Sequence, residues 1–73
     1  MQTEKIGERI RYLRMQNGIT QKELAKNLYV SGKTVSSWEL NRTEPDIASI
    51  IKLSLLFCIS LDYLLIGKTK NTL

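Results

Sequence analysis

The stretch from Thr20 to Glu39 constrains the fold most, because it carries the start signals of two short helices joined by a tight turn. Thr20 and Glu23 have the spacing of a capping box, in which each side chain accepts a hydrogen bond from the backbone N–H of the other residue. Ser31 is a second helix N-cap, and the connection over residues 28–30 is too short for anything but a sharp turn. The pattern therefore predicts a helix-turn-helix unit.

The second helix of this unit separates an apolar face from a polar one. At 3.6 residues per turn, Val35 and Trp38 lie on the inward face. The outward face is short, polar and basic, and it consists of Lys33, Ser36, Ser37 and Leu40. Small side chains let a helix backbone approach DNA closely, and donors near its N-terminus meet base edges or phosphates. This face predicts a helix that reads double-stranded DNA in the major groove.

The bulk composition fits one small domain with a polyanionic partner. The chain has 73 residues, a net charge of +4 and a sequence pI near 9.5, which favours a partner such as nucleic acid. It has one cysteine, Cys58, and no histidine, so we expect no internal disulfide, no metal site and no cofactor.

The apolar segments indicate a protein that works in the cytoplasm. The N-terminal residues are charged and lack the apolar core of a signal peptide. The longest apolar tract, residues 50–66, is interrupted by Lys52, Asp62 and serines, and falls short of a membrane span. We expect a cytoplasmic domain without a membrane segment or an evident small-molecule ligand.

Hydrophobic periodicity predicts an all-α fold of five short helices. The first helix is expected at residues 4–17, and the second and third are the two helices of the helix-turn-helix unit between Thr20 and Glu39. The fourth should run from Pro45 or Asp46 to about Phe57, and the fifth over Leu61–Ile66 after the N-cap Ser60. Asn41 is expected in the left-handed turn that ends the third helix, and Gly67 is expected to end the last. The domain should cover residues 1–67, with a flexible C-terminal tail at 68–73.

The same periodicity predicts the core and the solvated surface. The charged residues of the first helix, including Arg9 and Arg11, are expected mostly to be solvated. The core is expected to consist of Ile6, Ile10, Leu13, Ile19, Leu24, Leu28, Val35, Trp38, Ile47, Ile50, Leu53, Phe57, Ile59, Leu61 and Leu64.

Three segments, IGERIRYLRMQNGITQKELA, VSGKTVSSWE and PDIASIIKLSLLFCISLDYLL, carry a family resemblance over about Ile6 to Gly67. In this order and spacing, the sequence resembles the helix-turn-helix family of phage lambda-type repressors and Cro proteins, also called the XRE family. The resemblance implies a compact five-helix lambda-repressor-like domain with its helix-turn-helix at the second and third helices. It also implies a transcriptional regulator, usually a repressor, that binds operator DNA as a two-fold dimer.

The resemblance also implies roles for individual residues. It places Gln21 beside a phosphate and near the first base contact, and Arg42 near the DNA backbone. The reading face of the third helix would comprise Gly32, Lys33, Thr34 and Ser37, beside the outward-facing Ser36. It pairs Arg14 with Glu39, which agrees with the inward position of Glu39, where an unpaired carboxylate would be costly. The alternative is that both charged groups are solvated.

Two positions depart from the family pattern. The family often has Arg or Gln where this chain has Gly32, and Asn-Gly where it has Leu40 and Asn41. Gly32 removes one base or phosphate contact, so readout should rest on few side chains and on DNA shape. Lys33 is then the best candidate for reading a base, with a phosphate contact as the alternative.

The fourth and fifth helices carry more apolar residues than one core stripe can bury. Family dimers often meet through this region, so we expect a homodimer interface at Ile51, Leu55, Cys58, Tyr63 and Ile66. The alternative is that these residues only thicken a small core.

Other functional classes remain open on sequence alone. The domain could be the DNA-binding antitoxin of a toxin pair, or a helical bundle that binds other proteins. An enzyme is not expected, because Ser36 and Ser37 have no histidine or other base beside them.

Overall fold

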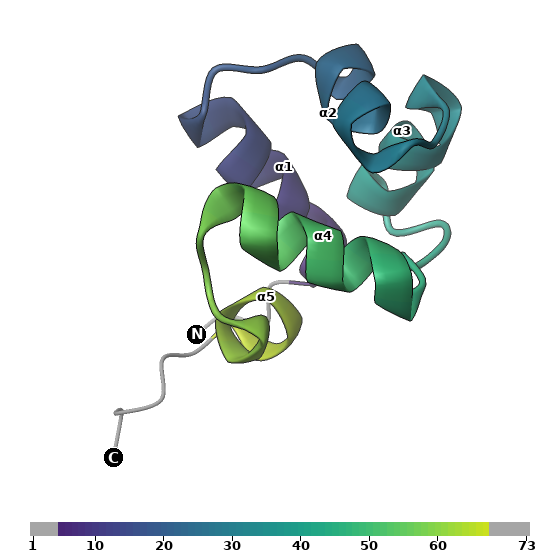
Figure 1. Ribbon diagram of the computed structural model, residues 1–73. Helices are drawn as coiled ribbons and strands as arrows, with labels where there is room; N and C mark the ends of the chain where they lie inside the picture. The colour runs from purple at the N-terminus through teal and green to yellow at the C-terminus, as the bar shows by residue number, and fades with distance from the viewer. Residues whose placement is uncertain (1–4, 68–73) are drawn as a thin grey trace.

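The computed structural model describes residues 5–67, and this part of the chain folds into five α-helices without a strand (Figure 1). The elements are α1 (Ile6–Gln16), α2 (Gln21–Leu28), α3 (Gly32–Glu39), α4 (Ile47–Phe57) and α5 (Leu61–Ile66). The expected all-α fold with a helix-turn-helix at α2 and α3 is confirmed. The expected tail at 68–73 lies outside the described residues.

Side-chain caps set the starts of the last four helices. The capping box of Thr20 and Glu23 is present, with Glu23 N–H donating to Thr20 Oγ1 at 3.0 Å and Thr20 N–H donating to Glu23 Oε1 at 2.8 Å. The other three helices start after the N-caps Ser31, Asp46 and Ser60, each of which accepts a hydrogen bond from a backbone N–H in the first turn. The first-turn N–H groups have no intrahelical acceptor, so these caps satisfy donors that would otherwise need water.

Residues in the left-handed conformation end α2, α4 and α5, and another lies just beyond the C-cap of α3. Asn41, after α3, has a φ of 60° as expected, and Gly67 ends α5 with a φ of 85°. Tyr29 and Cys58 end α2 and α4 with φ values of 60° and 55°. The sequence did not predict these last two positions, because glycine and asparagine are the residues that usually adopt this conformation.

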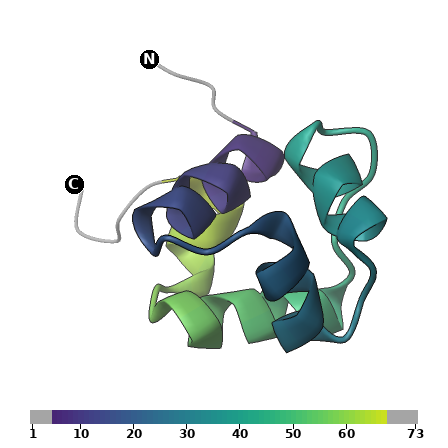
Figure 2. The same cartoon turned by 90° about the horizontal axis from the view of Figure 1, so that it is seen from above.

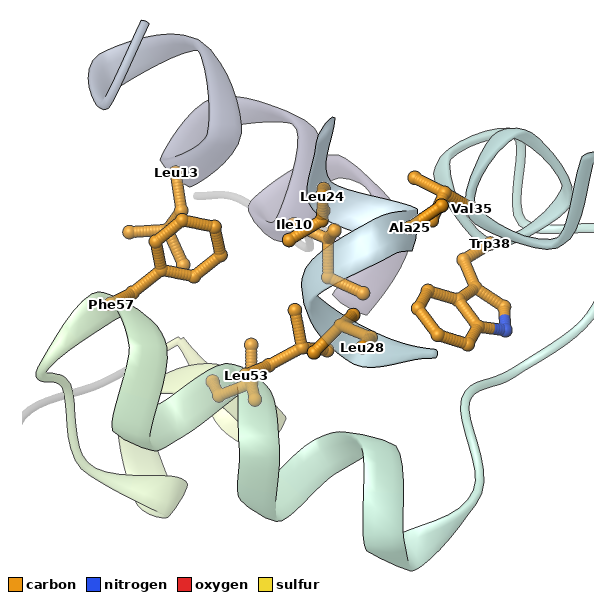
Figure 3. Packing of buried hydrophobic residues seen from close by; sticks show 10 residues of the cluster. Ile10, Leu13, Leu24, Ala25, Leu28, Val35, Trp38, Leu53 and Phe57 are labelled. Atoms are coloured by element: carbon orange, nitrogen blue, oxygen red, sulfur yellow. The ribbon is translucent and has the colours of Figure 1, made fainter. Parts of the chain in front are cut away.

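The core runs through the middle of the bundle and draws on all five helices. Figure 3 shows Leu13 facing Phe57 at one end and Trp38 at the other. Its fully buried side chains include Ile10, Leu24, Leu28, Val35, Leu53 and Leu64. Burying aliphatic side chains of this size stabilises a fold by about 1.5–3 kcal/mol each relative to exposure, so this cluster is the main support of the fold.

Two residues expected in the core lie on the surface instead. Ile47 is 75% exposed, since it precedes the buried Ser49 by two residues and therefore points about 200° away from it around α4. Leu61 is 43% exposed at the first position of α5, where Leu64, one turn later, makes the buried contact.

The expectation that Arg9 is solvated is wrong, because only 3% of this residue is exposed. Its guanidinium donates from Nε to the carbonyl oxygen of Leu64 at 2.8 Å and from Nη2 to that of Leu65 at 2.9 Å. Carbonyls in the last turn of a helix lack intrahelical donors. Arg9 supplies them, and so ties α1 to the end of α5.

A close approach at Gly7 fixes α1 against the end of α3. The N–H of Gly7 donates to Asn41 Oδ1 at 3.1 Å, and a Cβ at Gly7 would collide with the carbonyl oxygen of Trp38. Glycine is required here by space. Seen from above, α3 lies at the edge of the bundle away from α5 (Figure 2). The contacts of α3 to α1 and α2 therefore position it with one face outward.

Candidate nucleic-acid interface

The candidate interface is centred on α3, whose inner side is buried and whose outer side is accessible. Val35, Trp38 and Glu39 are buried, as the helical spacing predicts. Lys33 near the start of α3 is exposed, and its side chain makes no hydrogen bond or ion pair within residues 5–67. Its ammonium group is therefore available to an external acceptor.

The small side chains on α3 are half-buried, and two of their hydroxyls are already engaged. Thr34 Oγ1 and Ser31 Oγ lie 3.0 Å apart at the start of the helix. Ser37 Oγ and Thr43 Oγ1 lie 2.9 Å apart at its end. A hydroxyl can donate once and accept twice, so each keeps capacity for a further partner. These pairs restrict the hydroxyls to defined positions on the outer face.

Gly32, the first residue of α3, faces open space. A Cβ placed there would meet no heavy atom within 4 Å. Internal packing therefore does not require glycine at this position, unlike at Gly7. The absence of a side chain leaves the N-terminus of α3 open to close approach by a ligand.

Arg14 and Glu39 form an ion pair with two hydrogen bonds between α1 and α3. Arg14 Nε donates to Glu39 Oε2 at 2.7 Å, and Nη2 donates to Oε1 at 3.2 Å. A third guanidinium nitrogen, Nη1, donates to the carbonyl oxygen of Ile19 at 2.8 Å. The Glu39 side chain is 2% exposed, so its charge has to be compensated inside the protein. This pair holds the end of α3 against the end of α1.

Gln21 joins the same cluster, which the sequence did not predict. Its side-chain Nε2 donates to Glu39 Oε1 at 2.9 Å, so the first residue of α2 is bound to the last residue of α3. Sequence spacing gives no signal for this bond, because it depends on how the two helices approach each other. Arg42, the remaining predicted DNA contact, is exposed in the segment after α3.

A groove borders the outer face of α3 on the side of α1. Gln21 and Ser36, two of the predicted DNA contacts, line this groove together with the buried Glu39, so the groove is continuous with the candidate interface. Its remaining lining residues are Glu8, Arg11, Tyr12, Met15, Leu40 and Asn41. It mixes one exposed cation, Arg11, and one exposed carboxylate, Glu8, with apolar and amide groups. Across the described part of the chain, no group of three or more His, Cys, Asp or Glu residues lies close enough together to bind a metal ion.

Most residues of the expected dimer interface are on the surface. Ile51, Leu55, Cys58 and Ile66 are exposed, whereas Tyr63 is partly buried against the core. Leu56, Leu61 and Leu65 are also exposed on α4 and α5. We call the exposed members together the α4–α5 apolar surface, comprising Ile51, Leu55, Leu56, Cys58, Leu61, Leu65 and Ile66. None of the helices between residues 5 and 67 is long and apolar enough to cross a membrane.

Comparisons with known proteins place this geometry in a family context. A helix-turn-helix family model matches residues 10–64. Repressor protein C2 of Salmonella phage P22 is 40% identical over 72 residues, covering 99% of this chain and 33% of that protein. The HTH-type transcriptional regulator ImmR of Bacillus subtilis is 38% identical over 60 residues, covering 82% of this chain and 47% of that protein. The chain thus spans between a third and a half of the length of these relatives.

A solved structure extends the similarity to three dimensions. The P22 c2 repressor in complex with a synthetic operator superposes with a TM-score of 0.85 at 41% identity, covering 90% of this chain and 100% of that one. The fold, with its exposed α3, is therefore that of a repressor domain whose structure was determined on DNA.

Proposed function

Because the chain belongs to the helix-turn-helix family of XRE-type DNA-binding domains, we propose that it is a sequence-specific transcriptional regulator that binds double-stranded DNA. The observation that carries the proposal is the outer face of α3, where Lys33 extends from a helix of small side chains. The family and fold are those of DNA-binding regulators, and occupying a promoter requires no catalytic chemistry. The site of action would be the cytoplasm, where bacterial and phage operators lie.

The N-terminal half of α3 would enter the major groove. Gly32 lets the helix backbone come close, and Lys33 donates to the O6 and N7 acceptors of a guanine. Thr34, Ser36 and Ser37 would contact base edges or sugars from the same face. With so few long side chains, part of the specificity would come from sequence-dependent DNA shape.

Backbone contacts would fix the register of α3 on the duplex. Gln21 lies at the N-terminus of α2, where unsatisfied N–H groups and the helix dipole favour a phosphate. Arg42 would reach a second position along the backbone. These contacts carry little sequence information, but they determine which base pairs meet Lys33.

The regulator would act as a homodimer through the α4–α5 apolar surface. Exposed leucine and isoleucine side chains at this density are unusual on a small monomer, and a two-fold axis through α4 and α5 would cover them with a second copy. Such a dimer presents two α3 helices roughly 34 Å apart, which matches half-sites about one helical turn apart in a pseudo-palindromic operator. Occupying that operator would repress transcription.

Two measurements test this proposal. Binding to a selected operator should fall steeply as salt rises, because phosphate contacts release counterions. Sedimentation should show a dimer that Leu55→Glu dissociates, whereas Met15→Glu, also at an exposed apolar side chain but on α1, leaves it intact. Failure to bind any duplex at low salt would refute DNA binding, and a monomer that binds DNA as a monomer would refute the dimer.

A further inference from the structure

One buried carboxylate binds side chains from two other helices at the edge of the candidate interface. Glu39, the last residue of α3, accepts three hydrogen bonds: two from Arg14 of α1 and one from Gln21 of α2. Oε1 is shared between Arg14 Nη2 at 3.2 Å and Gln21 Nε2 at 2.9 Å. The Glu39 side chain is 2% exposed, and that of Arg14 is 13% exposed, while Gln21 extends toward the groove.

We propose that Glu39 is a positioning residue for a DNA contact, acting through Gln21. It would hold the Gln21 carboxamide in the one orientation that meets a phosphate at the N-terminus of α2. This inference rests on the proposed DNA-binding function and adds to it a role for the ion pair beyond stability.

The first argument is conformational. A glutamine side chain at a helix N-terminus samples several rotamers, and ordering it on binding costs free energy. Anchoring one N–H of Gln21 on a buried carboxylate removes that freedom in advance. The second N–H and the Oε1 acceptor stay available beside the backbone N–H groups of Gln21 and Lys22, which the helix itself cannot satisfy. These donors together form a preorganised site for one phosphate oxygen.

The second argument concerns charge. A lone carboxylate next to a phosphate would repel it, and the repulsion would be strong where water is excluded. Arg14 compensates Glu39 through two hydrogen bonds, so the cluster presents a polarised amide rather than a net negative charge. Arg14 is thus needed for Glu39 to orient Gln21 without opposing DNA.

The test is a double-mutant cycle on operator affinity. Gln21→Ala is measured in the wild-type chain and in the Arg14→Met/Glu39→Leu background, which replaces the ion pair with apolar side chains of similar volume. In the wild type, we expect Gln21→Ala to raise the Kd about 3–10-fold, the range for one hydrogen bond. In the background, where Gln21 has lost its anchor, the same substitution should change the Kd less than about twofold.

A purely structural role for the ion pair gives a different result. Equal effects of Gln21→Ala in both backgrounds would overturn the proposal. If the wild-type chain binds no DNA, both the proposed function and this inference fail, whereas equal effects with intact wild-type binding refute the inference alone.

A second measurement does not require the background variant to fold. Side-chain ¹⁵N relaxation in the free wild-type protein should show the Gln21 amide ordered on the nanosecond timescale, in contrast to the exposed Gln16 amide at the end of α1. A Gln21 amide as mobile as that of Gln16 would overturn the proposal.

Discussion

Arg9 donates from Nε to the carbonyl oxygen of Leu64 at 2.8 Å, across 55 residues of sequence. A buried guanidinium therefore closes the C-terminal end of α5 and couples it to α1. Since α1 also supplies Arg14 to the candidate interface, the α4–α5 apolar surface and α3 are both held by the same helix.

Removing this guanidinium should destabilise the domain strongly. We expect Arg9→Ala to lower the free energy of unfolding by about 3 kcal/mol, since it removes charge-assisted hydrogen bonds and leaves buried carbonyls without donors. Arg11→Ala, the control at an exposed position of the same helix, should change it by less than about 0.5 kcal/mol. Urea unfolding of the two variants checks this, and equal small effects would contradict it.

Alanine substitutions at two glycines should affect the stability of the fold differently. Gly7→Ala should destabilise by about 2 kcal/mol or more, because the added methyl collides with the Trp38 carbonyl and displaces the Asn41 side chain that holds α1 to α3. Gly32→Ala should leave stability unchanged or raise it by up to about 0.5 kcal/mol, since its Cβ meets open space and glycine costs backbone entropy. Thermal unfolding distinguishes the two variants, and a tolerated Gly7→Ala would contradict the close approach of α1 to the end of α3.

The N-cap of α4, Asp46, should make the stability of the fold depend on pH in the acidic range. The hydrogen bond with Ser49 lowers the pKa of the Asp46 carboxyl below its ordinary value of 3.8. A lowered folded-state pKa gives stability that is present above 3.8 and is lost as the pH falls through the folded value. Asp46→Asn keeps a capping acceptor but does not titrate. The stability difference between wild type and Asp46→Asn should therefore favour wild type at neutral pH and shrink below 3.8; a pH-independent difference would refute this.

Lys33 should carry a measurable part of the base readout. We expect Lys33→Ala to weaken operator binding by about 1–3 kcal/mol and to flatten the preference at one base pair. Lys52→Ala, which removes the same charge from α4, should change affinity little and base preference not at all. The DNA sequences selected by wild type, Lys33→Ala and Lys52→Ala decide whether Lys33 contacts a base or a phosphate. An unchanged base preference with Lys33→Ala would mean that Lys33 binds only the DNA backbone.

The parts of the fold that local chemistry determines could be predicted from the sequence. Thr20, Ser31 and Ser60 cap helices as expected, because a cap depends only on residues within one turn. The periodic stripe likewise identified Leu24, Val35 and most of the core.

The features that the sequence missed depend on contacts between helices. Arg9 was expected to be solvated, and the sequence carried no signal for a special role of Gly7. The importance of both residues arises from α3 and α5 packing against α1. Tyr29 adopts the left-handed conformation at the α2–α3 turn although its side chain gives no such signal. In the candidate interface, the Gln21–Glu39 bond was unpredictable for the same reason, whereas the inward position of Glu39 followed from helical spacing.

Binding-site selection shows directly whether α3 reads a specific DNA sequence. The purified chain is incubated with a random double-stranded pool at moderate salt, and the bound fraction is sequenced over successive rounds. We expect one enriched motif with two inverted half-sites whose centres are separated by about one helical turn, roughly 34 Å. A pool that binds without any enriched motif, or that does not bind at all, would contradict it.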